Sequence, residues 1–90
     1  MTMMAERITR KLEAALTPQR LQVIDESHQH HGHGGWREGG ETHFRVDIVS
    51  EAFRGKSRLE RHRLVNAALA EELADRVHAL AIAAKAPGEG

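Results

Sequence analysis

The stretch His43-Phe44-Arg45-Val46-Asp47-Ile48 decides the expected fold, because apolar and polar residues alternate along it without interruption. Side chains of an extended strand point to its two sides in turn. Phe44, Val46 and Ile48 therefore share one face, and the polar residues share the other. The alternation predicts a strand with one face against a core and the other toward solvent.

The residues before this strand predict a helix, a short strand and a long loop. Apolar side chains recur at helical spacing from Met4 to Leu16. The helix should stop near Thr17, because Pro18 cannot continue its hydrogen-bond ladder. Residues 21–25 read as a short strand. Residues 26–42 contain five Gly and four His without apolar periodicity, which is typical of a long flexible loop that is either functional or disordered.

The residues after the strand predict a helical region and a last strand. Ser57 and Glu60 have the spacing of a capping box, and an apolar stripe follows them to about Asp75. Residues 77–84 are apolar, small and without a polar face, which favours a buried strand, although their alanine content leaves a helix as the alternative. Residues 86–90 are expected to be a flexible tail.

This order predicts one small α+β domain over residues 1–90, with its core at about residues 4–85. Two strands joined by a loop can pair as an antiparallel hairpin. The third strand follows a helical crossover and should lie parallel to one of them. We therefore expect a three-stranded mixed sheet covered by helices.

The composition excludes several classes of protein. Lys and Arg together balance Asp and Glu, so no net charge steers the chain toward nucleic acid or membrane. The chain contains no Cys, which excludes disulfides, thiol nucleophiles and a thiolate metal site made by this chain alone. No segment approaches the roughly 20 apolar residues of a membrane span, and residues 1–10 lack a targeting pattern. A cytoplasmic location is expected.

Histidines are the first candidates for chemistry. Four of the seven fall in residues 28–33 among glycines, where they either surround a metal ion or form a solvated loop. His78 is expected on the apolar face of the last strand, where it is either a hydrogen-bonded core residue or a ligand. Two imidazoles replace two thiolates on one iron of a Rieske [2Fe–2S] centre. A chain without Cys could complete such a cluster only with a partner's thiolates.

A basic run is the second candidate. It opposes the helix macrodipole at the start of the helical region, so helix stability does not explain it. It is either a contact for phosphate or an acidic partner, or a solvated face. The candidate contact residues are Arg54, Lys56, Arg58, Arg61 and Arg63. No catalytic triad, carboxylate pair or phosphate-binding loop occurs in the sequence, so an enzyme is not expected.

Several segments, taken in order, resemble the BolA family. They are Lys11-Leu12 with Ala15-Leu16-Thr17-Pro18; Asp25-Glu26-Ser27; His30 with Gly32-His33; Thr42-His43-Phe44-Arg45-Val46; Val49-Ser50 with Phe53; Gly55-Lys56-Ser57; Arg61-His62-Arg63-Leu64-Val65; Glu71-Glu72-Leu73; and Val77-His78-Ala79-Leu80. The resemblance covers nearly the whole chain, from Ile8 to Pro87.

The resemblance implies a class II KH-like fold of order αββααβ, with a short helix or turn before the long helix. It also implies a heterodimer with a monothiol glutaredoxin that shares a [2Fe–2S] cluster, the partner side supplying Cys and glutathione. The family's ligand positions fall on His78 and His30, with His33 as the alternative to His30. A role in iron–sulfur cluster maturation, trafficking or iron sensing follows.

The resemblance implies a second function as a DNA-binding transcriptional regulator, through the helix-turn-helix-like segment 54–65 that contains the basic run. The segment Arg54-Gly55-Lys56-Ser57-Arg58 has one glycine where nucleic-acid-binding KH domains have a G-x-x-G loop, which argues against RNA binding in the KH manner. By itself the chain is expected to be a monomer or weak homodimer, to bind DNA at most weakly and to hold no cluster.

Overall fold

The computed structural model describes residues 3–26, 43–75 and 77–89, and its elements follow the predicted order. They are α1 (Met3–Leu16), β1 (Arg20–Asp25), β2 (His43–Val49), the 3-10 helix η2 (Glu51–Phe53), α2 (Arg58–Ala68), α3 (Ala70–Ala74) and β3 (Ala79–Lys85). The short helix η2 stands before α2, as the family resemblance implied. The α+β class is confirmed.

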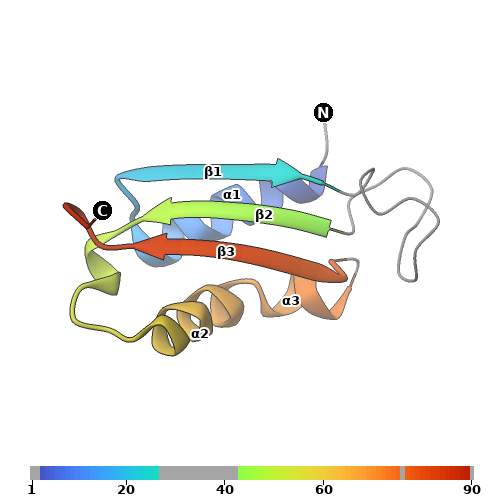
Figure 1. Cartoon of the computed structure of the whole chain (residues 1–90). Coiled ribbons are helices and arrows are strands. Elements are labelled where there is room, and N and C mark those ends of the chain that lie inside the picture. Colours follow the sequence, from blue (N-terminus) through green and yellow to red (C-terminus); the bar gives the residue numbers. More distant parts are fainter. Residues whose placement is uncertain (1–2, 27–42, 76, 90) are drawn as a thin grey trace.

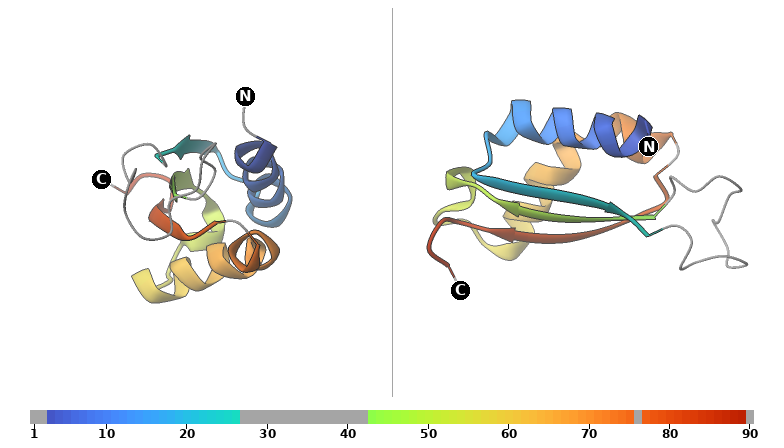
Figure 2. Two further views of the ribbon diagram at one scale, coloured as in Figure 1. Left: turned by 90° about the vertical axis from the view of Figure 1, so that its right-hand side faces the viewer. Right: turned by 90° about the horizontal axis from the view of Figure 1, so that it is seen from above.

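The three strands form one mixed sheet in the order β1-β2-β3. The strands β1 and β2 are antiparallel, with Val23 opposite Val46, whereas β2 and β3 are parallel, with Val46 opposite Ile82. The helices α1, α2 and α3 all lie on one face of this sheet (Figures 1 and 2). The mixed sheet is confirmed, and the helices cover one of its faces.

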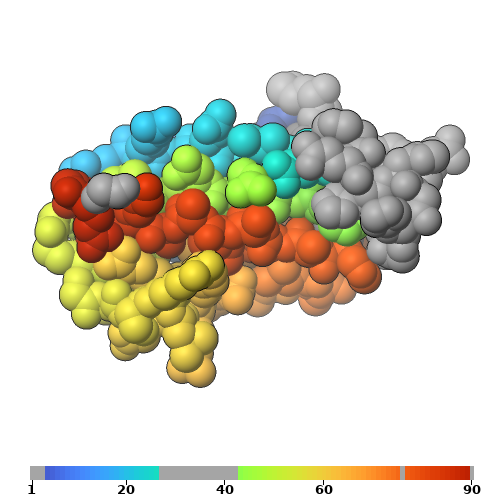
Figure 3. Space-filling view, viewed as in Figure 1, coloured from blue at the N-terminus to red at the C-terminus, as the bar shows by residue number. Residues whose placement is uncertain are grey.

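The other face of the sheet is open, and side chains of all three strands reach the surface on it (Figure 3). The prediction of a buried last strand is therefore wrong for this face, because Ala79, Ala81 and Ala83 are exposed. Small alanine side chains can stand in a strand that is buried on both of its faces, but they can equally well face solvent. The alternative of a helix over residues 77–84 is excluded, since β3 pairs with β2 over seven residues.

The core lies between the sheet and the helices. Phe44, Val46 and Ile48 are almost fully buried, as their alternation predicted. The other buried apolar residues come from α1, η2, α2, the segments next to α3 and the C-terminal turn: Met4, Ile8, Leu12, Leu16, Phe53, Val65, Leu69, Val77 and Ala86. Every layer of the domain thus contributes to one apolar cluster.

The helical crossover begins at the predicted capping box. The Ser57 hydroxyl accepts from the backbone N–H of Glu60 at 3.1 Å, and the Glu60 carboxylate accepts from the N–H of Ser57 at 2.7 Å. The predicted helical region is broken at Leu69, which separates α2 from α3. This break directs Glu72 of α3 toward the basic side chains of α1. Among the described residues, no helix is long and apolar enough to cross a membrane.

The C-terminal residues 86–89, where the sequence predicts a flexible tail, contact the rest of the domain. Ala86 is buried, and its N–H donates to the carboxylate of Glu89 at 2.8 Å. The same carboxylate accepts two hydrogen bonds from the Arg61 guanidinium, at 2.6 and 2.9 Å. The sequence could not reveal this contact because it joins residues 28 positions apart.

Candidate functional site

His78 lies just before β3 and is exposed to solvent. The prediction that it stands on the apolar face of the strand is wrong, because the ladder with β2 begins one residue later, at Ala79. The preceding residue, Val77, is buried and donates its N–H to the carbonyl of Glu72 at 3.1 Å. This hydrogen bond anchors the chain at the end of α3 and leaves the imidazole of His78 accessible.

His43, which the sequence analysis assigned to the solvent face of its strand, is 6% exposed and lies beside His78. The centres of the two rings are 5.7 Å apart, and the rings are inclined by 52°. The parallel register explains this proximity, because it sets His43 opposite Ala79. The sequence did not reveal that His43 and His78 are neighbours, because their proximity depends on the pairing of β2 with β3, which are far apart in the chain.

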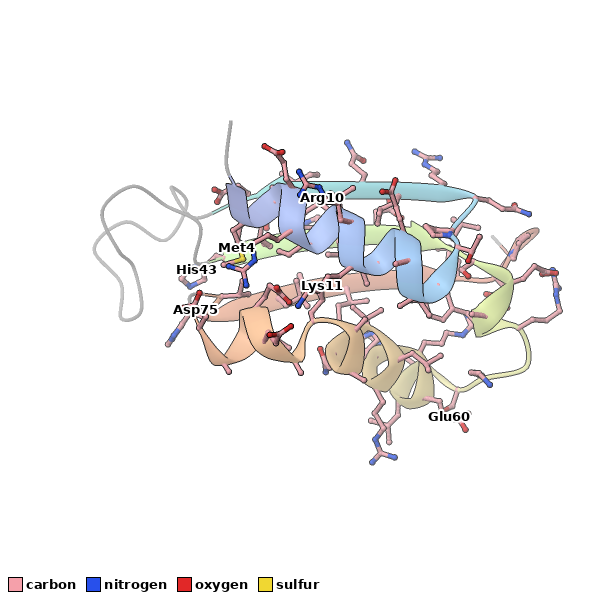
Figure 4. The ribbon with its side chains drawn as sticks, turned by 180° about the vertical axis from the view of Figure 1, so that it is seen from behind. Met4, Arg10, Lys11, His43, Glu60 and Asp75 are labelled. Atoms are coloured by element: carbon pink, nitrogen blue, oxygen red, sulfur yellow. The ribbon has the colours of Figure 1, made fainter. Side chains whose placement is uncertain are left out.

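The predicted loop ligands, His30 and the alternative His33, lie outside the described residues. Both residues that flank segment 27–42 are described, and they stand side by side: the Glu26 N–H donates to the His43 carbonyl at 2.8 Å. Since His43 is next to His78, both residues that flank this segment lie near the start of the last strand. Figure 4 shows His43 at the end of the sheet near Asp75 and Met4.

A surface pocket of about 360 Å³ lies at this end of the open face. Its lining includes Glu26, His43, Arg45 and Ala79. The carboxylate of Glu26 accepts from the Arg45 guanidinium at 3.0 Å, which neutralises both charges within the pocket. Among the described residues, no three His, Asp or Glu side chains converge closely enough to hold a metal ion. The two histidines that lie side by side at this end of the sheet are His43 and His78.

The basic run at the opposite end of β3 divides into two kinds of residue. Arg54 is paired with Glu51 at 2.9 Å and donates to the Pro87 carbonyl. Arg61, whose side chain is 13% exposed, donates to Glu89 and to the carbonyls of Lys56 and Ala84. These two predicted contact residues hold the C-terminal turn in place. Hydrogen bonds to Glu51 and Glu89 raise the pKa of Arg54 and Arg61, respectively.

The other three predicted contact residues, Lys56, Arg58 and Arg63, are exposed. Lys56 and Arg58 line a groove of about 460 Å³ that runs between the start of α2 and the end of β3. His62 and Lys85 also line this basic groove. The capping hydrogen bonds from Ser57 lower the pKa of Glu60, and the nearby positive charges of Lys56 and Arg63 lower it further.

A buried ion cluster joins α1 to α3, and sequence reasoning missed it. The side chain of Glu72 is fully buried and pairs with Arg7 at 2.8 Å and Lys11 at 2.9 Å. Burial alone raises the pKa of Glu72, but hydrogen bonds from Lys11 and Arg7 outweigh it, so the pKa lies below its usual value. Figure 4 shows Lys11 where α1 faces the other helices. One clue to the burial of Glu72 was present in the sequence. Glu72 stands three residues after the apolar Leu69, and residues at this spacing lie on the same side of a helix.

These features define a small α+β domain of αββααβ order with exposed sites at the two ends of an open mixed sheet. The chain belongs to the BolA family: the family model for BolA-like proteins matches residues 12–89. Its sequence is 48% identical over 80 residues to the "DNA-binding transcriptional regulator BolA" of Escherichia coli, covering 89% of this chain and 72% of that protein.

A plant relative shows that this domain also occurs inside a longer chain. The sequence is 51% identical over 87 residues to SufE-like protein 1 of Arabidopsis thaliana, covering 92% of this chain but only 24% of that protein. The solved structure of the BolA domain of Arabidopsis SufE1 matches with a TM-score of 0.90 at 48% identity, covering 100% of this chain and 99% of that domain.

Proposed function

We propose that this protein is a non-enzymatic adaptor of the cytoplasm that binds a monothiol glutaredoxin and shares a [2Fe–2S] cluster with it. Its role would be the maturation or trafficking of iron–sulfur clusters, or iron sensing. The observation that carries the proposal is the exposed imidazole of His78 at the open end of the sheet. The histidine falls on the ligand position that the family resemblance implies.

The donor set of this chain fits half of such a cluster. Imidazoles can replace thiolates on one iron, and the absence of Cys leaves the remaining ligands to the partner and its glutathione. His78 supplies one imidazole, and His30 the second, with His33 as its alternative. The bound cluster would supply transferable iron and sulfide or an iron-dependent signal. The chain's own contribution is to hold His78 accessible through the Val77–Glu72 hydrogen bond.

Reconstitution of the complex tests this proposal. The chain, a monothiol glutaredoxin and glutathione are combined with iron and sulfide, and the cluster is followed by absorption, circular dichroism and electron paramagnetic resonance. His78→Ala should abolish the spectrum of the mixed complex, and His30→Ala should weaken it or let His33 substitute. His62→Ala is the matched control, because His62 lies in the basic groove at the other end of β3. An unchanged spectrum in the double variant His30→Ala/His78→Ala would refute the ligand assignment.

The isolated chain provides a second test of the shared cluster. Without thiolates it should purify folded, colourless and free of stoichiometric iron. Iron analysis and the visible absorption spectrum of the purified chain measure this directly. A stable cluster on the chain alone, with no added thiol, contradicts the proposal.

DNA binding is the second candidate function, and the basic groove is the observation that favours it. Lys56 and Arg58 line the groove without an ion pair among the described residues, which leaves them available to phosphates. The curated name of the Escherichia coli relative describes that protein as a DNA-binding transcriptional regulator. The zero net charge and the involvement of Arg54 and Arg61 in the fold rank this function below the first.

A further inference from the structure

The guanidinium of Arg61 is held in one orientation by backbone groups from two parts of the chain. Its Nε donates to the carbonyl of Lys56 at 3.0 Å, shortly before the start of α2. Its Nη1 donates to the carbonyl of Ala84 in β3 at 3.2 Å. Because both acceptors belong to the backbone, the guanidinium keeps this orientation whether or not another side chain pairs with it.

A third backbone group points to the same place. The N–H of Ala86 donates to Oε1 of Glu89 at 2.8 Å, and Nη1 and Nη2 of Arg61 donate to Oε1 and Oε2 at 2.6 and 2.9 Å. Ala86 is buried, and the sheet fixes the residue before it, since the Lys85 carbonyl accepts from the N–H of Ser50 at 2.9 Å. Two guanidinium nitrogens and one backbone N–H therefore form an oxyanion cradle.

The oxyanion that occupies this cradle is a carboxylate of the chain itself. The side chain of Glu89 is 41% exposed, and it follows the end of β3. Glu89 can therefore leave the cradle without breaking the sheet. It is the one acidic side chain among the described residues that line the basic groove, whose other charged lining residues are Lys56, Arg58, Arg61 and Lys85.

We propose that the oxyanion cradle is a binding site for a phosphate group, and that Glu89 is an intramolecular competitor which the phosphate displaces. Arginine binds phosphate in the same bidentate manner as carboxylate. A terminal phosphate carries more negative charge than a carboxylate at neutral pH, so the cations of the groove favour it over Glu89. After the exchange the buried N–H of Ala86 keeps an acceptor, and Arg61 keeps a counter-ion.

This site requires neither glutaredoxin nor a cluster, and free phosphate suffices as its ligand, so it does not rest on either proposed function. It gives Arg61 a second role besides holding the C-terminal turn. Ligand affinity falls in proportion to the fraction of molecules in which the binding site is free. Phosphate binding at Arg61 is therefore weakened in proportion to the occupancy of the cradle by Glu89.

Titration of the whole chain with sodium phosphate, compared with sodium chloride at equal ionic strength, tests the cradle. Nitrogen-15 spectra follow the backbone amide of Ala86 and Nε of Arg61. Glu89→Ala should raise the phosphate affinity at these signals at least about fivefold, because the competitor is gone. Glu51→Ala is the matched control, since it takes one carboxylate from the neighbouring Arg54 and leaves the cradle intact. Its phosphate affinity should stay close to that of the wild type.

The wild type provides a test that no folding defect of a variant can obscure. Saturating phosphate should release Glu89, so the carbon-13 resonance of its carboxylate should move to the position of an unpaired glutamate. Three results overturn the proposal: an Ala86 signal that phosphate leaves unchanged in the wild type and in Glu89→Ala, phosphate binding without release of Glu89, or an equal gain in Glu51→Ala.

Duplex DNA distinguishes the two sources of a phosphate group. If nucleic acid supplies it, Glu89→Ala should steepen the dependence of log affinity on log salt concentration by about 0.9, because Arg61 then neutralises one more phosphate. Adding Arg61→Gln to this variant should remove the gain. An unchanged slope together with an intact response to free phosphate assigns the cradle to small phosphate-bearing molecules. Absence of both responses refutes the site.

Discussion

Glu71 and Glu72 are neighbours in α3 and both pair with Lys11, yet their surroundings differ completely. The Glu71 side chain is 82% exposed, whereas that of Glu72 is fully buried and also contacts Arg7. A surface ion pair contributes little to stability because water screens it. Neutralising a buried carboxylate that is paired with cations removes its charge-assisted hydrogen bonds and leaves a buried polar group with poorer partners.

Removing the charge at the two positions should therefore have different effects. Glu72→Gln should lower the free energy of unfolding by about 1–3 kcal/mol, because the amide pairs poorly with Arg7 and Lys11. Glu71→Gln is the matched control and should change it by less than about 0.5 kcal/mol. Urea denaturation at neutral pH measures both values. Equal effects at the two positions would show that burial of Glu72 does not matter.

The carboxylate of Glu89 joins the C-terminal turn to Arg61 of α2. Hydrogen bonds from Arg61, and then from the Ala86 N–H, lower the pKa of Glu89 to about 2, compared with 4.5 normally. A group whose folded pKa is depressed stabilises the fold fully above its unfolded pKa. That contribution is lost as the pH falls through 4.5 toward 2.

Acid titration of stability tests this attachment. Thermal denaturation of the wild type should show a falling midpoint between pH 5 and 2. In Glu89→Gln the midpoint should be lower at neutral pH and fall less steeply, with the remaining acid dependence coming from groups such as Glu72 and Glu60. Arg61→Gln should reproduce the defect, and the double variant should add little to either change. The same acid dependence in Glu89→Gln and wild type would contradict the proposed contact.

The elements that the sequence predicts well depend on local patterns. The alternation in β2, the helical spacing of α1 and the capping box at Ser57 all express interactions within a few residues. The features that it missed depend on long-range contacts. The burial of His43, the partners of Glu72 and the attachment of Glu89 each follow from contacts between residues distant in the chain. The ligand positions His78 and His30 came from family resemblance, since periodicity alone left His78 ambiguous.

On the scale of the whole molecule, β3 separates the two candidate sites. The histidine pair lies at its start, and Lys85 of the basic groove is its last residue. A seven-residue strand at about 3.3 Å per residue spans about 20 Å. That length exceeds the Debye length of about 8 Å at physiological ionic strength. Charges at one end should therefore affect the other end little, and the two functions can be separated by substitution.

Salt dependence of DNA binding makes this separation measurable. If Lys56, Arg58 and Arg63 contact phosphates, the logarithm of affinity for duplex DNA should fall steeply with the logarithm of salt concentration. Each Gln substitution should reduce the slope by about 0.9. Arg10→Gln is the matched control, because Arg10 is an exposed basic residue of α1, away from the groove (Figure 4). Fluorescence anisotropy across a range of salt concentrations measures the slopes.

The same substitutions should leave the cluster spectrum of the glutaredoxin complex unchanged. Lys56 and Arg58 line the groove at the far end of β3 from His78, and Arg63 lies in α2 beside Lys56. If the groove instead attracts an acidic partner, the substitutions should slow association with glutaredoxin and still preserve that spectrum. We expect weak, salt-sensitive DNA binding without sequence preference, since three available cations neutralise few phosphates. Site-specific binding that persists at physiological salt against scrambled competitor DNA would reverse the order of the two functions and make regulation of transcription the first.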